Sequence, residues 1–226
     1  MRGTRTTLVT LLRSRLSARP RAAVRRERGL LLATATACAA DWGWPVLPGA
    51  AADRDGCRCA RPDCPTPGAH PDDPSLLAAT TDPRMVEWWW GRRPDAPVLV
   101  ATGGRVSAVS LPAAAGVRVL EYFDALRIRT GPVIATPTRY VLLVAPYTLP
   151  ELGELLVAQE WVPTSLRYHG DGGYAVLPPS RTGAGAVRWV REPAGDGAPW
   201  LPAVGELMGA LVAASAAVPD GARLAY

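Results

Sequence analysis

The sequence predicts a domain of the α+β or α/β class, with helices packed around a central sheet. Two observations support this fold class. Short apolar segments typical of strands are interspersed with longer segments typical of helices. The chain has 226 residues, of which 48% are hydrophobic, so it can bury a sizeable core. Without an internal repeat or long linker, we expect an arm (1–28), one domain (29–217) and a short C-terminal tail (218–226).

The expected elements follow from local start and stop signals. Thr81 or Asp82 can cap a helix that has Pro83 in its first turn, and Gly103 and Gly104 close a buried strand. Helices are expected at residues 29–41, 83–90, 112–126, 149–159 and 202–217. Strands are expected at residues 44–47, 98–101, 106–111, 133–135, 140–145, 166–168, 174–177 and 187–190.

The net charge of +5 is concentrated in the arm. Residues 1–28 hold nine arginines and one acid, Glu27, which leaves the remainder of the chain slightly acidic. This arm could contact nucleic acid or an acidic protein partner, although a solvated, partly helical tail is the simpler interpretation. All 25 basic residues are Arg, which is typical of a GC-rich bacterial genome.

The sequence favours a cytoplasmic protein without a membrane partner. No apolar run approaches the roughly 20 residues that a transmembrane helix needs, and the Arg-rich N-terminus lacks the pattern of a signal peptide. Cys38 lies in an apolar segment and is expected in the core, while the other three cysteines are clustered. Clustered thiols beside a metal are typical of a reducing compartment.

That cluster is the clearest chemical motif in the chain. Cys57, Cys59, Cys64 and His70 fall within fourteen residues, and Pro and Gly around Cys64 can turn the chain back on itself. Three thiolates and one imidazole are the ligand set of a closed, tetrahedral structural zinc site. A Cys57–Cys64 disulfide and free thiols remain alternatives. A site with four protein ligands has no open position for a substrate, so we expect a structural rather than a catalytic metal.

Three consecutive tryptophans, Trp88, Trp89 and Trp90, cannot all face the core of one helix. At least one is expected at the edge of the core. Core packing is the simpler role for this segment, and a stacking platform for bases or a protein-docking surface is the alternative.

Several segments together resemble one family, the bifunctional DNA primase/polymerase N-terminal (prim-pol) domain of the archaeo-eukaryotic primase superfamily. The matching segments are residues 42–48, 57–71, 80–83, 88–90, 98–103, 131–138 and 170–180, in the family's order. The resemblance implies an α+β fold with a mixed or antiparallel central sheet, flanking helices and a small zinc-binding loop. It also implies nucleotidyl transfer by two divalent metal ions held by acidic residues.

The sequence departs from the family where catalysis would occur. The resemblance places the Asp-x-Asp pair of the family at Ser110 and Pro112, and its third acid at Arg167. The strand that bears a His in the family contains Arg139 and no His. Mg²⁺ prefers charged oxygen ligands, so we expect no catalytic Mg²⁺ or Mn²⁺ and no intact two-metal site.

Other acids do not restore the site convincingly. The nearest in sequence are Glu121, Asp124, Glu151, Glu154 and Asp171. A solvated helix face accounts for Glu121 and Asp124, and turn chemistry accounts for Asp171. Ser107 or Ser110 as a hydrolytic nucleophile would need a base and an elbow motif, and the sequence indicates neither.

We therefore expect a catalytically silent domain that binds a nucleotide, nucleic acid or acidic partner. Arg139, Arg167, His169 and Arg181 are the expected binding residues, through charge-assisted contacts. Two alternatives remain: an active primase/polymerase with displaced acids, and a structural domain that docks a protein through its arm or residues 88–90.

Overall fold

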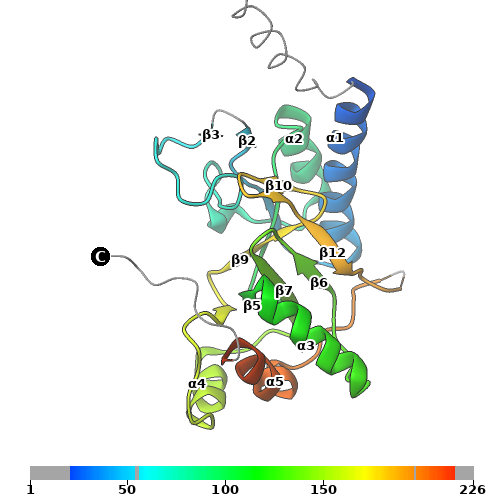
Figure 1. The fold of residues 1–226 in the computed structure, drawn as a ribbon. Helices are drawn as coiled ribbons and strands as arrows, with labels where there is room; N and C mark the ends of the chain where they lie inside the picture. Colours follow the sequence, from blue (N-terminus) through cyan, green and yellow to red (C-terminus); the bar gives the residue numbers. More distant parts are fainter. Residues whose placement is uncertain (1–20, 54–55, 196, 217–226) are drawn as a thin grey trace, which may run out of the picture.

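The computed structural model describes residues 21–53, 56–195 and 197–216. The first twenty residues of the expected arm and the whole expected C-terminal tail therefore lie outside the described residues. The five α-helices of the described part are α1 (Arg21–Thr36), α2 (Pro83–Arg92), α3 (Ala113–Ala125), α4 (Leu149–Val157) and α5 (Val204–Ala216). Figure 1 shows α1 and α2 side by side at one end of the molecule, and α3, α4 and α5 at the other.

The predicted α+β class is confirmed, and every strand pair in the described ranges is antiparallel. A five-stranded sheet has the order β12 (Arg188–Arg191), β6 (Val133–Ala135), β7 (Arg139–Val144), β5 (Ser107–Pro112) and β8 (Arg167–His169). A three-stranded sheet has the order β1 (Val46–Pro48), β4 (Val98–Ala101) and β9 (Tyr174–Leu177). Two small hairpins pair β2 (Ala52–Asp53) with β3 (Gly56–Cys57), and β10 (Arg181–Thr182) with β11 (Gly185–Ala186).

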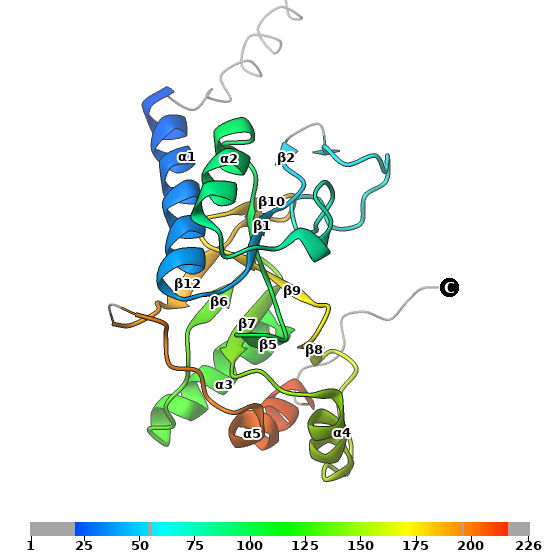
Figure 2. The same ribbon diagram turned by 180° about the vertical axis from the view of Figure 1, so that it is seen from behind.

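The five-stranded sheet is buried on both faces. Val109 and Leu111 on one face of β5 join a core with α3 and α5. Ala108 on the other face joins a core with the three-stranded sheet, α1 and α2. Alternation of side chains along a strand places neighbouring residues in opposite layers. Figures 1 and 2 show the resulting order of helices, sheets and helices along the molecule.

Helix α2 begins where the sequence predicts. The Asp82 side chain accepts a hydrogen bond from the Arg84 amide at 2.9 Å, and Pro83 occupies the first turn. Trp89 and Trp90 are buried, whereas Trp88 is 50% exposed and stacks with the Arg92 guanidinium. One tryptophan of the three therefore lies at the edge of the core, as expected.

Two expectations about secondary structure were incomplete. Helix α1 already includes residues 21–28, ahead of the expected start at residue 29, because these residues are mostly Arg, Ala and Glu, which favour helices. It continues through a π-helical turn, Ala37–Asp41, which contains the buried Cys38. The hairpins β2–β3 and β10–β11 were not predicted, since two-residue strands carry no periodic signal. Within the described ranges, every helix is too short or too polar to span a bilayer.

Candidate functional site

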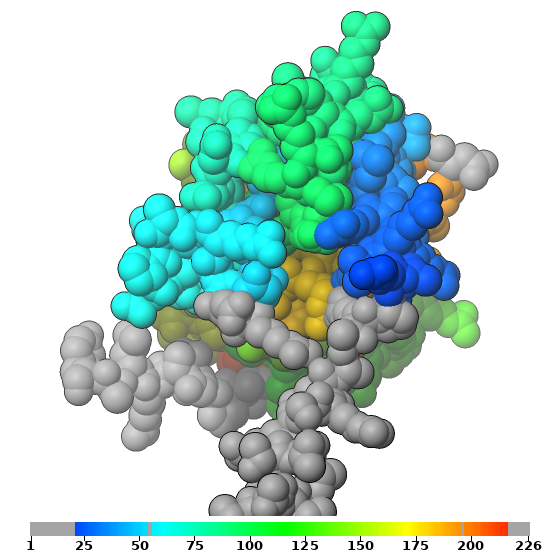
Figure 3. Space-filling model, turned by 90° about the horizontal axis from the view of Figure 1, so that it is seen from above, coloured from blue at the N-terminus to red at the C-terminus, as the bar shows by residue number. Residues whose placement is uncertain are grey.

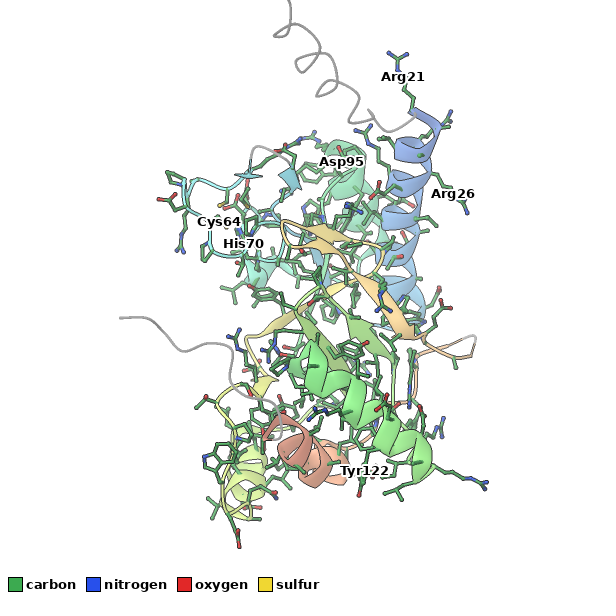
Figure 4. All side chains as sticks on the ribbon, in the orientation of Figure 1. Arg21, Arg26, Cys64, His70, Asp95 and Tyr122 are labelled. Atoms are coloured by element: carbon green, nitrogen blue, oxygen red, sulfur yellow. The ribbon has the colours of Figure 1, made fainter. Side chains whose placement is uncertain are left out.

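The Cys57–His70 cluster forms a compact set of metal-ligating atoms. The ligand atoms of Cys57, Cys59, Cys64 and His70 all lie within 4.8 Å of one another. The Sγ atoms of Cys57 and Cys64 are each 3.3 Å from Nε2 of His70. Figure 4 shows Cys64 and His70 close together at the side of the molecule, in the loop after β3. All the cysteines are free, so the disulfide alternative is not observed.

Short backbone pairings hold both ends of this loop. Hairpin β2–β3 carries Cys57, and the Ala50 amide donates to the His70 carbonyl at 3.0 Å. The Nδ1 atom of His70 lies 2.6 Å from the Pro71 carbonyl, an arrangement in which Nδ1–H donates and Nε2 is left to bind a metal. This is the tautomer that a zinc site requires.

The donor set fits zinc. A tetrahedral Zn²⁺ with ordinary Zn–S and Zn–N bonds separates its ligand atoms by about 3.5–3.8 Å. Here both Sγ–Nε2 separations are 3.3 Å, and all four ligand atoms lie within 4.8 Å of one another. Burial opposes ionisation of Cys57, but hydrogen bonds from the backbone amides of Cys59 and Gly68, together with the contact to the His70 ring, outweigh it. The pKa of the Cys57 thiol is thereby lowered to about 6. A thiolate at neutral pH is the form that binds a metal.

The second feature is a polar floor on the five-stranded sheet. Ser110 on β5 is opposite Val141 on β7 and Arg167 on β8, while Ala108 is opposite His169 and Pro112 is opposite Arg139. Directly opposite residues share a face of the sheet, and so do residues two apart on one strand. The register therefore gathers Ser110, Arg139, Arg167 and His169 on one face. This is the face that packs toward the three-stranded sheet.

A hydrogen-bonded network joins three of these side chains. Ser110 Oγ lies 2.9 Å from His169 Nε2 and accepts a hydrogen bond from Arg139 Nε at 3.1 Å. Nη2 of Arg139 also donates to the carbonyls of Ser110 and Ser165, at 2.7 and 2.6 Å. Arg139 thus connects β7 to β5 and to the loop before β8. The sequence did not reveal the Ser110–His169 contact, because the two residues are 59 positions apart.

His169 is held neutral. Burial, reinforced by the positive charges of Arg139 and Arg167, lowers the pKa of His169 to about 4. Ser110 Oγ accepts from Arg139 and is also hydrogen-bonded to Nε2 of the neutral ring. An imidazole with so low a pKa is a weak general base, which disfavours Ser110 as a hydrolytic nucleophile although a His lies beside it.

These side chains line a cavity of about 530 Å³ between the two sheets. Ser110, Arg139, Arg167 and His169 contribute its polar floor. The remaining walls come from the loop at residues 65–69, the turn between β6 and β7, the start of β9 and the β10–β11 hairpin. Arg181, the fourth predicted binding residue, is exposed on β10 and is not among the lining residues.

No Asp or Glu is among the described residues that line this cavity. Asp124 is paired with Arg191 on β12, and Glu151 completes the capping box of α4 with Thr148. Asp171 is exposed in the turn before β9. Within the described part of the chain, the Cys/His cluster is the one group of three or more potential metal ligands that lies close together.

Comparison with known proteins identifies the family. The chain matches the family described as Prim-Pol, bifunctional DNA primase/polymerase, N-terminal, over residues 35–203. No curated protein and no solved structure matches the chain. The family match covers about three-quarters of the sequence and spans both the cluster and the cavity floor. The chain therefore belongs to the bifunctional DNA primase/polymerase N-terminal family.

Proposed function

We propose that this prim-pol domain is catalytically silent and binds the phosphate groups of a nucleotide or nucleic-acid strand in the cavity between its sheets. The observation that carries the proposal is the composition of the cavity floor. Two arginines, a neutral histidine and a serine lie together there, and the lining contains no carboxylate among the described residues. Such a floor suits an anion and disfavours a pair of divalent cations.

The resemblance to the family set out in the sequence analysis supports the loss of nucleotidyl transfer. The expected positions of the three family acids fall on Ser110, Pro112 and Arg167, and the first and third of these are paired across β5 and β8. An acid at residue 167 would attract a metal ion, whereas Arg167 repels one. The same position can instead donate charge-assisted hydrogen bonds to a phosphate.

The size and walls of the cavity support a nucleotide as the ligand. A volume of about 530 Å³ lies within the usual range of small-molecule sites. Opposite the polar floor stand apolar and small residues of the loop at 65–69 and of β9, including Tyr174. A nucleotide has anionic phosphates that can bind the polar floor and a planar base that can pack against the opposite wall.

The cluster has a separate, structural role in this proposal. Its four ligand atoms leave no position for a substrate, so Zn²⁺ bound there would tie the loop together and supply no step of a reaction. No resident Mg²⁺ or Mn²⁺ is proposed for the cavity.

The test measures binding of a fluorescent deoxyadenosine triphosphate in the presence of EDTA, which removes free divalent cations. The EDTA concentration and the exposure time are kept too low to remove zinc from the cluster. We expect binding without divalent cations, and a loss of affinity of about tenfold in Arg167→Ala. Arg84→Ala is the matched control, since it removes an exposed arginine at the start of α2. Equal affinity in all three proteins would refute the phosphate site.

A primer-extension assay with Mg²⁺ and then Mn²⁺ tests the alternative of an active polymerase with displaced acids. The proposed function predicts no incorporation above that of a heat-inactivated sample. Incorporation that is abolished by Asp171→Asn or Glu121→Gln would establish the alternative and overturn catalytic silence.

A further inference from the structure

The segment between two of the metal ligands is also a wall of the cavity. Five residues separate Cys64 from His70, and four of them line the cavity: Pro65, Thr66, Pro67 and Ala69. The metal cluster and the cavity are therefore two sides of one stretch of chain. Tyr174 on β9 lines both the cavity and the hollow on the cluster side.

The fifth residue, Gly68, seats this wall on the β10–β11 hairpin. Gly68 has φ +73°, and a Cβ there would lie 2.9 Å from Cα of Thr182 and 3.0 Å from the Arg181 carbonyl. The Gly183 amide donates to the Pro67 carbonyl at 2.7 Å. A side chain at residue 68 would collide with backbone, so the close approach requires glycine.

Little else holds the wall in place. Residues 58–70 contain no helix or strand. Ordering the backbone of such an irregular segment costs its full conformational entropy unless cross-links restrain the chain. A metal bound to Cys57, Cys59, Cys64 and His70 would hold both ends of the wall at once.

We infer that metal binding at the cluster controls the affinity of the cavity for its phosphate ligand, by holding the wall at residues 65–69 against the β10–β11 hairpin. This inference rests on the proposed function for the identity of the ligand. The coupling is reciprocal: a ligand that contacts the wall raises the affinity of the cluster for the metal by the same factor.

Hydrogen exchange of the Gly183 amide tests the wall without any ligand. This amide donates a hydrogen bond to the Pro67 carbonyl, so we expect it to be protected from exchange in zinc-loaded protein. After zinc removal we expect its exchange to speed up by at least about tenfold. The Leu143 amide, which donates to the Pro132 carbonyl in the five-stranded sheet, is the internal control and should not change. Unchanged protection of Gly183 in zinc-free protein would overturn the inference.

Ligand binding provides the second measurement. The affinity for fluorescent deoxyadenosine triphosphate should fall about tenfold when zinc is removed and return when zinc is added back. If zinc-loaded protein binds no nucleotide, the proposed function fails, and the exchange measurement still decides whether the metal holds the wall. If affinity is equal with and without zinc, the coupling fails and the proposed function stands.

Two glycine substitutions distinguish the effect of displacing the wall from the effect of backbone strain alone. Gly68→Ala places a methyl group against β10, whereas Gly43→Ala has a similar positive φ, +64°, and nothing within 4 Å of the new Cβ. Gly68→Ala should weaken nucleotide binding about tenfold and Gly43→Ala less than about twofold. Loss of zinc from Gly68→Ala would support the coupling between the metal cluster and the wall. Wild-type affinity of Gly68→Ala for the nucleotide would refute that coupling.

Discussion

The metal cluster and the cavity floor share a segment of chain but are built on different supports. Three of the four cluster residues lie in residues 58–70, which contain no helix or strand, and the fourth, Cys57, ends the two-residue strand β3. The floor lies on three paired strands of a sheet that is buried on both faces. A sheet keeps its shape when polar side chains on it change, whereas an irregular loop depends on its cross-links. Under the proposed loss of the family's catalytic acids, this contrast would explain how the cluster keeps its donor set while the floor changes.

The two regions also have opposite electrostatic character. The pKa of Cys57 is lowered to about 6, so the cluster presents a thiolate that suits a cation. The pKa of His169 is lowered to about 4 by burial and by Arg139 and Arg167, so the floor keeps its guanidinium charges beside a neutral imidazole. The first arrangement favours a metal and the second favours an anion. Figure 3 shows α1 and α2 beside the cyan segment that follows β1, which is the segment that carries the metal cluster.

The largest expected effect comes from replacing a metal ligand. Cys64→Ser should lower zinc affinity by on the order of 100-fold or more, because a weak oxygen donor replaces a thiolate. Zinc content measured against protein concentration should fall from about one equivalent to near zero, with exchange increased in residues 58–71 and unchanged in β5 and β7. Cys38→Ala, which removes a buried thiol outside the cluster, should keep its zinc. Unfolding of the sheet in Cys64→Ser would show that the sheet, and not only the wall at residues 65–69, depends on the cluster.

The next largest effect is on the free energy of unfolding, and it differs between Arg139 and Arg167. Arg139→Met removes donors to Ser110 Oγ and to the carbonyls of Ser110 and Ser165, and should lower the free energy of unfolding by about 2–4 kcal/mol. Arg167→Met removes an exposed side chain and should change it by less than about 0.5 kcal/mol. Urea titration of both variants measures the difference. Equal destabilisation would mean that Arg139 is not a structural link between the strands.

Much of the fold follows from local signals in the sequence. The strands at residues 98–101, 133–135 and 174–177 occur at the predicted positions, because short apolar runs bounded by Gly and Pro are typical of buried strands. The start of α2 follows from its cap and Pro83. The order of strands in the five-stranded sheet does not follow, since pairing across long separations depends on the packed core and not on local pattern.

The candidate site could also be predicted only in part. The four members of the cluster are close in sequence, so their spacing predicts their convergence. The contact between Ser110 and His169 depends on the register of β5 with β8, which no local signal encodes. Nor could the sequence reveal that residues 65–69 line the cavity. That proximity comes from the unpredicted β10–β11 hairpin and the glycine contacts that seat the loop on it.

A smaller effect concerns the pH dependence of stability. His169 has a folded pKa of about 4, below its ordinary value of 6.5, so between these pH values the unfolded state binds more protons than the folded state. The stabilisation from the neutral imidazole is therefore present above pH 6.5 and is lost as the pH falls toward 4. We expect a loss on the order of 2 kcal/mol over this window that His169→Gln does not show. Urea titrations of both proteins at several pH values measure it, and parallel curves would contradict a buried neutral His169.

The smallest expected effect is that of Arg181→Ala. Arg181 is exposed on β10 and does not line the cavity, so it can act on a bound phosphate only through solvent. Salt screens such an interaction over a Debye length of about 8 Å at physiological ionic strength. Nucleotide affinity should fall about twofold at low salt and not at all at high salt, whereas the effect of Arg167→Ala should persist at both, because a direct charge-assisted contact is screened far less. A large, salt-resistant loss in Arg181→Ala would mean that the ligand extends over the hairpin and that the floor alone does not define the site.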